Sequence, residues 1–343
     1  MNFKTLMIGL SLAGVLAVAP AVTGAETLNG AGATFPNLIY TQWHGQFAAT
    51  HSGNTINYQS IGSGAGIAQY KAGTVDFGAT DAPLTDAEVS SLPQPTLHIP
   101  TVAGAVVMIY NIPGVGPGLH LTGDIIADIY LGKIKTWNDP RIEKLNAGRN
   151  LPSQPITVVH RADGSGTSFI YTSYLSAVSG EWKSGPGVGK SVSWPCGIGG
   201  AGNPAVAGLV KNSRGAIGYV ELAYAIQNKL AYAAVRNKSG NFVTANLQST
   251  AAAANAAVAQ MQKDVRVSIV NGPGINTYPI SGFTYLLVPK SPRNAAKGRV
   301  LVEYLHWIMQ EPQQAMAEEK LYAPLPASVL AINEKSISKI KVR

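Results

Sequence analysis

Short apolar segments and helix-like segments alternate along this chain, and that alternation limits the folds available to it. Strands are expected at residues 55–59, 74–79, 102–109, 156–159, 216–220 and 280–288. Helices with apolar residues at helical spacing are expected around them, at residues 36–49, 67–71, 122–131, 168–178, 221–228, 249–262 and 294–309. Because a strand, a helix and a second strand in succession place the two strands parallel, this order predicts an α/β architecture with mostly parallel sheets.

The length of the chain, 343 residues, is enough for about two domains. No repeat of fixed period and no long low-complexity linker divides it. Two domains without one clear linker suggest that the chain crosses between them more than once.

The first 25 residues have the pattern of a cleaved secretory signal peptide. Lys4 gives a positive start, residues 6–19 are largely apolar, and small residues precede Glu26. A membrane anchor is the alternative interpretation, but the apolar run is short for a span and no basic residues follow it. We therefore expect residues 1–25 to be removed from an exported, soluble protein.

The mature chain is expected to be basic and to be stabilised by its core rather than by disulfides. Cys196 is the single cysteine, and we expect it to pack as a small, buried apolar residue. The formal net charge of +8 would suit an anionic ligand, nucleic acid or an acidic membrane surface. Since no run of five basic residues occurs and the basic residues are not interleaved with aromatics, we expect no nucleic-acid partner.

Three loops rich in glycine and hydroxyl residues each precede an expected helix. They are residues 30–35 (GAGATF), 61–66 (IGSGAG) and 163–168 (DGSGTS). The first backbone N–H groups of a helix have no partner within it, and glycine lets a ligand approach them closely. One such loop often does no more than cap its helix, but three in one chain favour a site for an oxyanion.

Arg161 and Asp163 lie between an expected strand and the third of these helices. The arginine presents a planar set of N–H donors that matches a tetrahedral oxyanion, and Asp163 is the natural partner to orient it. An ordinary surface ion pair is the alternative. The position favours a binding role, since α/β proteins bind ligands at the carboxyl ends of their strands.

Asp81 also follows an expected strand, although a carboxylate has the wrong charge for an anion site. It becomes useful if the ligand carries a proton, because orthophosphate can donate a hydrogen bond to Asp81 near neutral pH and sulfate cannot. A buried acceptor left unpaired would discriminate strongly against sulfate. Asp81 could equally begin the turn before Pro83, and the residues alone leave the two interpretations even.

The sequence contains no complete catalytic or metal-binding motif. Residues 185–191 (GPGVGKS) resemble a nucleotide-binding P-loop, but position 184 is serine and no helix pattern follows. Ser63 and Ser165 lack the frame of a nucleophile elbow. The six histidines are scattered, without pairs at metal-ligand spacing, and His160 is expected to be structural. We therefore expect no catalytic residues, no metal and no cofactor.

Five segments, in order along the chain, resemble the PstS family, which are the phosphate-binding proteins of the phosphate-specific ABC transporter and belong to the periplasmic binding proteins. They are residues 30–36 (GAGATFP), 75–84 (VDFGATDAPL), 128–134 (DIYLGKI), 161–169 (RADGSGTSF) and 215–221 (GAIGYVE). A single segment would be weak support, but five in register are specific.

The resemblance also implies the residues of a phosphate site. Phosphate would accept hydrogen bonds from Thr34, the Phe35 backbone, Ser63, Arg161, Ser165, the Gly166 backbone and Thr167. Asp81 would accept the phosphate proton, and Asp163 would pair with Arg161. These positions fall in or beside the loops that the residue pattern singles out.

For the fold, the resemblance implies a type II-like periplasmic-binding-protein fold, with two hinge-linked α/β lobes, a mixed, mostly parallel sheet in each, and a ligand cleft between them. Residues 26–103 and 282–343 are expected to form lobe I, and residues 104–281 lobe II. For function, it implies a monomeric, high-affinity periplasmic receptor that passes inorganic phosphate unchanged to a membrane ABC permease and its ATPase. A receptor for sulfate or another oxyanion, and a secreted phosphomonoesterase, are the alternatives.

Overall fold

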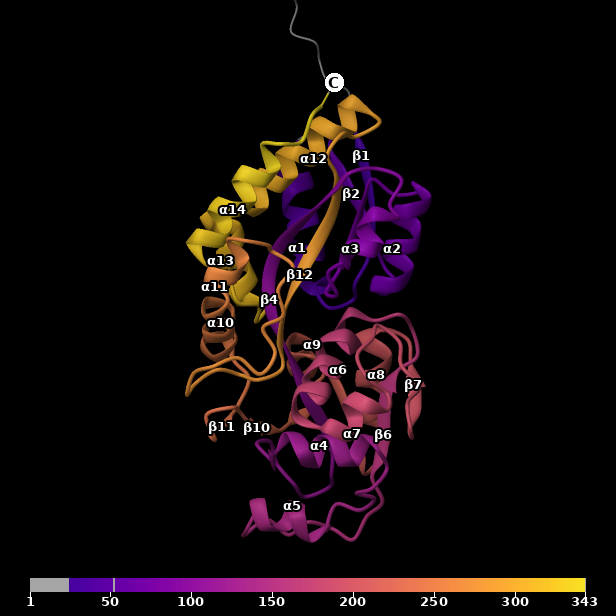
Figure 1. Cartoon of the computed structure of the whole chain (residues 1–343), viewed down its shortest axis with the longest axis vertical. Coiled ribbons are helices and arrows are strands. Elements are labelled where there is room, and N and C mark those ends of the chain that lie inside the picture. Colours follow the sequence, from indigo (N-terminus) through magenta and orange to yellow (C-terminus); the bar gives the residue numbers. More distant parts are fainter. Residues whose placement is uncertain (1–24, 52, 343) are drawn as a thin grey trace, which may run out of the picture.

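The computed structural model describes residues 25–51 and 53–342. The expected signal peptide, residues 1–25, lies outside this range except for Ala25. Figure 1 shows an elongated molecule with two halves, one above the other along its longest axis. The upper half contains residues 25–95 and 290–342, and the lower half contains residues 112–227.

Three parallel strands form the middle of the upper half, with β1 (Thr27–Gly32) between β2 (Thr55–Ser60) and β3 (Phe77–Thr80). Helix α1 (Asn37–Thr50) buries Trp43 and Phe47. The Phe47 ring packs edge-on against Tyr304, with 5.3 Å between the ring centroids. Burial of these aromatic side chains stabilises the half. The remaining helices are α2 (Ser63–Ala72), α3 (Asp86–Ser90), α12 (Ala295–Ile308), α13 (Glu311–Glu319) and α14 (Ala327–Ile337).

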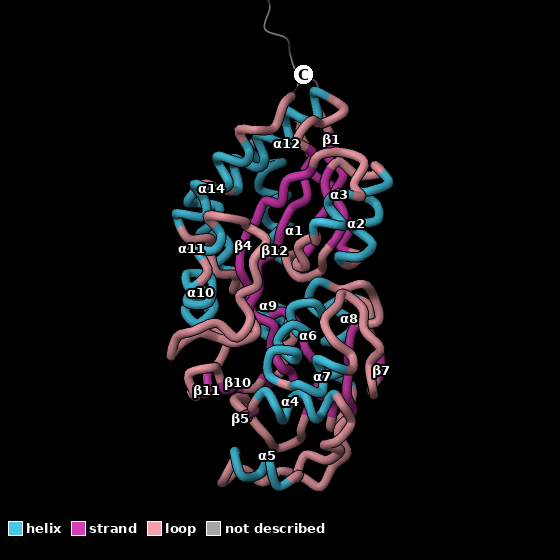
Figure 2. Tube along the Cα trace, viewed as in Figure 1, coloured by secondary structure: helices cyan, strands magenta, loops and turns pink. Residues whose placement is uncertain are grey.

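A second parallel set forms the sheet of the lower half, in the order β8 (Ala216–Glu221), β6 (Thr157–Arg161) and β7 (Ile198–Gly200). Figure 2 shows helices and loops around these strands. Tyr171 and Tyr219 stack in its core, with 4.2 Å between their ring centroids. The helices are α4 (Gly123–Tyr130), α5 (Pro140–Leu145), α6 (Gly166–Val178), α7 (Gly180–Ser184), α8 (Gly202–Asn212) and α9 (Leu222–Gln227).

One long strand, β4 (Thr96–Asn111), joins the two halves (Figure 1). Residues 96–105 of β4 pair antiparallel with β12 (Ser281–Pro289), which pairs with β3, and residues 106–111 pair antiparallel with β8. The strand order is therefore β2-β1-β3-β12-β4-β8-β6-β7. The expected mixed α/β fold with parallel strands in each half is confirmed. The expected lobe limits near residues 103 and 281 fall inside β4 and at the start of β12, and they stay a prediction.

The segment between the lower half and β12 runs along one side of the molecule. It contains β9 (Ala231–Tyr232), β10 (Ala234–Arg236), β11 (Phe242–Val243), α10 (Leu247–Ala256) and α11 (Val258–Met261), and β10 also pairs with β5 (His120–Leu121). The single helix expected at residues 249–262 is thus two helices. Asn246 caps the first through a reciprocal pair of hydrogen bonds with Ser249, so this helix begins two residues before its expected start.

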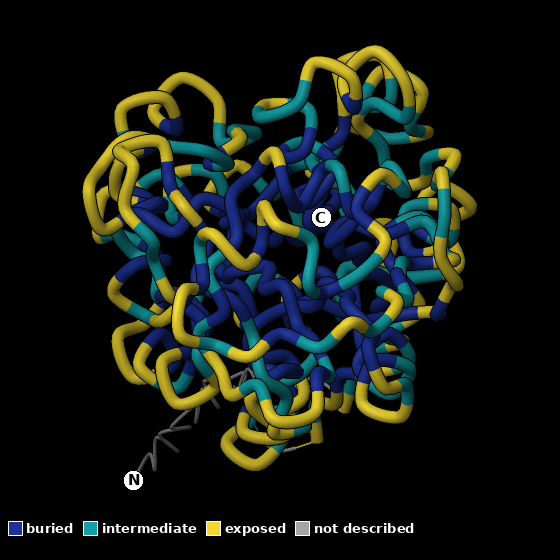
Figure 3. Tube along the Cα trace, turned by 90° about the horizontal axis from the view of Figure 1, so that it is seen from below, coloured by how far each residue is buried: buried dark blue, intermediate teal, exposed yellow. Residues whose placement is uncertain are grey.

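The apolar core is continuous through both halves, and exposed residues lie mainly on the outside of the molecule (Figure 3). Cys196 is only partly buried, and its thiol contacts the carbonyl oxygens of Ile129 and Tyr130. Within residues 25–51 and 53–342, no helix is both long and apolar enough to cross a membrane.

Candidate functional site

The N-termini of α2 and α6 meet where the two halves touch. Ser63 and Gly166 are the first residues of these helices, and the Gly166 N–H donates to Ser63 Oγ at 3.1 Å. The Gly64 N–H donates to the Gly164 carbonyl at 2.7 Å, so the first turn of α2 also contacts the loop before α6. Two positive helix ends at one place favour the binding of an anion.

The Arg161 guanidinium is buried beside these helix ends and is paired with Asp163. Its Nε donates to Asp163 Oδ1 at 2.7 Å, and Nη2 donates to Oδ2 at 2.5 Å, so both carboxylate oxygens are engaged. Nη1 donates to Thr167 Oγ1 at 3.3 Å. Burial alone would raise the pKa of Asp163, but hydrogen bonds and charge from Arg161 hold that pKa below its usual value. The Asp163 carboxylate therefore fixes the plane of the guanidinium.

Asp81 follows β3 and lies on the upper side of the same site, where it is 3% exposed. Its Oδ1 accepts a hydrogen bond from the Thr284 hydroxyl at 2.8 Å. Its Oδ2 is buried and accepts no hydrogen bond from the residues that the structure describes. Burial raises the pKa of Asp81 to about 7, against the lowering effects of the Thr284 hydrogen bond and the Arg161 charge. Asp81 therefore changes from a neutral carboxyl to a carboxylate close to neutral pH.

Two serine hydroxyls of the site accept hydrogen bonds from backbone N–H groups. Ser63 Oγ accepts from Gly166 and, at 3.4 Å, from Asp81. Ser165 is the N-cap of α6, and its Oγ accepts from the Ser168 N–H at 3.0 Å. Because a hydroxyl has one hydrogen and two lone pairs, both serines keep an O–H that can be donated to a ligand.

Two threonine hydroxyls also accept hydrogen bonds from N–H groups. Thr167 Oγ1 accepts from Arg161 and from Asn203 Nδ2, the latter at 3.1 Å. Thr34 Oγ1 accepts from the backbone N–H of Asn203 at 3.1 Å and from Asn203 Nδ2 at 2.9 Å. Both threonines are buried, so their O–H groups are donors in a region of low dielectric.

Glycine permits the close approach of the two halves at this site. Gly62 has φ +91°, and a side chain on it would overlap the Asp163 carboxylate. A Cβ on Gly166 would lie 2.5 Å from Asp81 Oδ2 and 2.6 Å from Ser63 Oγ. The backbone of α6 thus contacts Asp81 and Ser63 directly, with no room for a methyl group between them.

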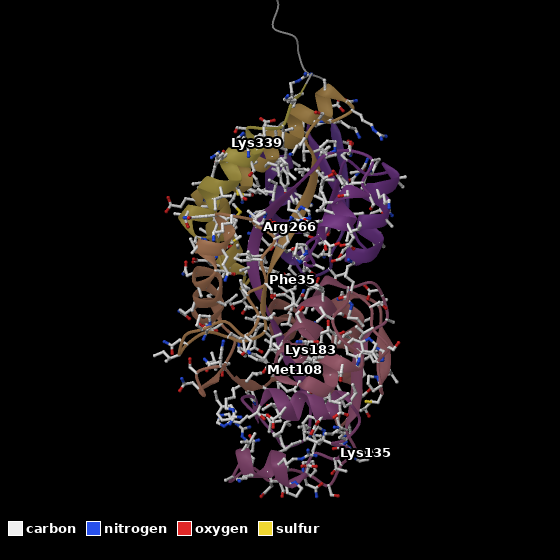
Figure 4. All side chains as sticks on the ribbon, viewed as in Figure 1. Phe35, Met108, Lys135, Lys183, Arg266 and Lys339 are labelled. Carbon is white, nitrogen blue, oxygen red and sulfur yellow. The ribbon has the colours of Figure 1, made fainter. Side chains whose placement is uncertain are left out.

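Buried tyrosines from both halves hold the loop after β1. The Tyr224 hydroxyl of α9 donates to the Thr34 carbonyl at 2.6 Å, and the Tyr322 hydroxyl donates to the Phe35 carbonyl at 2.7 Å. Figure 4 labels Phe35 at the level where the two halves meet. The backbone of Thr34 and Phe35 is therefore held by hydrogen bonds from both halves.

The structure brings all nine residues expected at a phosphate site into this one region, although their binding roles stay a prediction. Sequence reasoning missed Thr284, which contacts Asp81, and Asn203, which contacts both threonines. Neither had a local signal in the sequence, and the helix that begins at Gly202 is not among the expected ones. The nine residues are Thr34, Phe35, Ser63, Asp81, Arg161, Asp163, Ser165, Gly166 and Thr167.

His160 neighbours Arg161 in sequence but is turned away from the site. Its ring stacks on Trp194, with 4.9 Å between the ring centroids, and Nδ1 lies 3.0 Å from the Arg161 carbonyl oxygen. In the part of the chain that the structure describes, no three His, Cys, Asp or Glu side chains are grouped so that they could hold a metal ion.

The chain resembles known sequences over most of its length. A family model described as a PBP superfamily domain matches residues 17–311. A protein from Xylella fastidiosa (strain Temecula1), named phosphate-binding protein PstS, is 44% identical over 90% of this chain and 84% of its own length. A protein of the same name from Pasteurella multocida is 45% identical over 90% of this chain and 89% of its own length.

Comparison with solved structures supports the fold. A high affinity periplasmic phosphate-binding protein, solved with bound phosphate, superposes with a TM-score of 0.72 at 20% identity, covering 91% of this chain and 94% of its own. A phosphate-binding protein from Stenotrophomonas maltophilia gives a TM-score of 0.67 at 19% identity, covering 90% of this chain and 93% of its own.

Proposed function

Because the chain belongs to the PstS phosphate-binding proteins of the PBP superfamily, we propose that it is a high-affinity receptor that binds inorganic phosphate between its two halves. It acts in the periplasm after removal of the signal peptide and delivers phosphate to an ABC permease and its ATPase. It works as a monomer. The nine residues named above form the site, and the two lobes close on the ion by a hinge motion.

One observation carries this proposal. Between the two halves, four hydroxyl donors, an arginine fork and two helix N-termini lie in one region with a buried carboxylate, one oxygen of which accepts no hydrogen bond from the described residues. The donors match the oxygens of a tetrahedral anion, and the carboxylate matches a proton on that anion. Orthophosphate carries both features near neutral pH, whereas sulfate carries only the first.

A phosphomonoesterase is the alternative from a different class, and the partners of the serines argue against it. An activated serine needs a general base within hydrogen-bond reach of its hydroxyl. Ser63 Oγ and Ser165 Oγ are instead bonded to backbone N–H groups, and His160 stacks on Trp194. We infer that phosphate enters and leaves this site without a change of covalent bonds.

Equilibrium dialysis of phosphate-stripped mature protein with labelled phosphate, beside a chromogenic phosphate-ester assay, tests the proposal. The expected result is one phosphate bound per chain and no release of the chromophore. Turnover of the ester would favour the hydrolase, and failure to bind phosphate would contradict the receptor.

The pKa of Asp81 predicts how the choice between phosphate and sulfate changes with pH. Below pH 7 the neutral carboxyl can donate to a fully deprotonated anion, and above pH 7 the carboxylate repels it. Sulfate affinity should therefore fall as pH rises from 6 to 8, by about 10-fold or more, while phosphate remains bound. In Asp81→Asn, whose amide donates at every pH, sulfate should bind with little pH dependence. Calorimetric titrations of both proteins across this range provide the measurement.

An ion pair across the two halves predicts a smaller, salt-dependent effect on affinity. Lys190 Nζ lies 2.8 Å from Glu88 Oε1. The Lys190 carbonyl oxygen also accepts a hydrogen bond from the Ser165 N–H. In Lys190→Met, phosphate affinity should fall about 3-fold, since a partly exposed pair contributes under 1 kcal/mol. The difference should largely disappear at about 1 M salt.

Lys297→Met is the matched control for this prediction. Lys297 pairs with Asp76 at 2.9 Å with similar exposure, but both residues lie in the upper half. The phosphate affinity of Lys297→Met should equal that of the wild type at every salt concentration. Equal effects of the two variants would show that the Lys190 pair has no special part in closure.

A further inference from the structure

Asn203 is a fully buried side chain that connects the two halves at the proposed site. It is the second residue of α8, in the lower half. Its Nδ2 donates to Thr34 Oγ1 of the upper half at 2.9 Å and to Thr167 Oγ1 of the lower half at 3.1 Å. Its own backbone N–H donates to Thr34 Oγ1 as well, at 3.1 Å. One residue thus contacts both threonine hydroxyls.

The orientation of the Asn203 amide is fixed by a third partner. The backbone N–H of Glu221, at the end of β8, donates to Asn203 Oδ1 at 3.0 Å. A backbone N–H can only donate, so the oxygen of the amide faces Glu221 and the NH₂ group faces the threonines. Both hydrogens of the NH₂ group are then used, one for each hydroxyl.

This arrangement determines which way the threonine hydroxyls donate. Thr34 Oγ1 receives two N–H groups from Asn203, and Thr167 Oγ1 receives one from Asn203 and one from Arg161. With both lone pairs occupied, neither oxygen can accept from a ligand, and each O–H must point elsewhere. Both hydroxyls are therefore available only as donors.

We propose that Asn203 is a positioning residue that makes Thr34 and Thr167 obligate donors to the bound anion and links their placement across the closed site. This inference rests on the proposed phosphate-binding function. Asn203 acts through the two hydroxyls and does not itself contact the ion. Once the halves are closed, no free energy is spent on reorienting these two donors toward the ion.

Asn203→Asp tests the inference with almost no change of shape. The aspartate oxygens accept hydrogen bonds, so the two threonines turn their O–H groups toward the side chain and away from the ligand. Phosphate affinity should fall by about 100-fold, because two hydrogen bonds to a charged ligand are lost. Asn203→Ala removes the amide without adding a charge and should cost about 10-fold. If Asn203→Asp does not fold, the binding of phosphate to Asn203→Ala still tests the inference.

Asn333→Asp is the matched control, since Asn333 is an equally buried asparagine whose Nδ2 donates to the Pro100 carbonyl, away from the site. It should lose thermal stability but bind phosphate like the wild type. Comparable binding losses in Asn203→Asp and Asn333→Asp would mean that Asn203 has only a structural role, and would overturn the inference.

A double-mutant cycle separates positioning from direct contact. Thr34→Val removes one of the hydroxyls through which Asn203 acts, so Asn203→Ala should cost clearly less in this background than in the wild type. An undiminished loss would show that Asn203 works independently of Thr34 and would contradict the inference.

If the wild type itself binds no phosphate, both the proposed function and this inference are contradicted. If the wild type binds phosphate and Asn203→Ala binds equally well, only the role of Asn203 is overturned.

Discussion

Replacement of Gly166 by alanine is expected to lower phosphate affinity on the order of 100-fold while the fold remains intact. The added methyl group would lie 2.5 Å from Asp81 Oδ2, 2.6 Å from Ser63 Oγ and 2.7 Å from Asp81 Cβ. Gly166 belongs to the lower half and the other two residues to the upper half. The methyl group therefore prevents the halves from approaching and displaces Asp81 and Ser63 together.

Titration calorimetry on Gly166→Ala and on a control, Gly208→Ala, measures this effect. Gly208 lies within α8 in the lower half, and a Cβ there would meet nothing within 4 Å. The control should bind phosphate like the wild type and gain stability of about 1 kcal/mol, because alanine is the better helix former. Wild-type affinity in Gly166→Ala would show that the two halves do not need this contact to hold the ion.

Arg161→Met is the second substitution with a large expected effect, a loss of phosphate affinity on the order of 1000-fold. The variant keeps an unbranched side chain of similar length but removes the planar N–H donors. It also leaves the Asp163 carboxylate without its partner, next to the place where an anion must bind. Repulsion from Asp163 then adds to the loss of attraction from Arg161.

Competition dialysis against labelled phosphate measures this loss, with Arg141→Met as the control. Arg141 pairs with Asp139 and Asp128 on the surface of the lower half and is about half exposed. Its replacement should change neither affinity nor, to any large extent, stability. If Arg161→Met and Arg141→Met bind phosphate equally, the arginine fork is not part of the site.

The loops of the site were predictable from the sequence because their signals are local. A glycine next to a serine or threonine, after a strand and before a helix, is recognisable in a few residues, as at 61–66 and 163–168. The structure places both loops where α2 and α6 begin. The Arg161–Asp163 pair follows from the same loop, since its two members are only two residues apart.

The partners that complete the site were not predictable, because they come from distant parts of the chain. Thr284 lies 203 residues after Asp81, and Asn203 lies 169 residues after Thr34. A single sequence does not reveal which strands will be neighbours, so these contacts appear only once β12 is placed beside β3 and α8 beside the upper half. No helix is expected at residues 202–212, where α8 lies, so nothing in the sequence around Asn203 marks it as part of a site.

β4 is longer than the sequence pattern predicts, for a local reason. The sequence pattern predicts a strand at residues 102–109, whereas β4 extends over Thr96–Asn111. Pro100 and the polar residue His98 interrupt the apolar run and weaken the strand pattern. The pairing of β4 with β12 shifts by one residue near Pro100, and such a bulge allows proline within a strand.

A calorimetric titration of the phosphate-stripped mature protein with phosphate and, separately, with sulfate at pH 8 tests the central claim most directly. At this pH Asp81 is ionised, so its free oxygen accepts the phosphate proton and repels sulfate. We expect tight one-to-one binding of phosphate and no heat from sulfate. Equal binding of both ions would contradict the role of Asp81, and binding of neither would contradict the receptor itself.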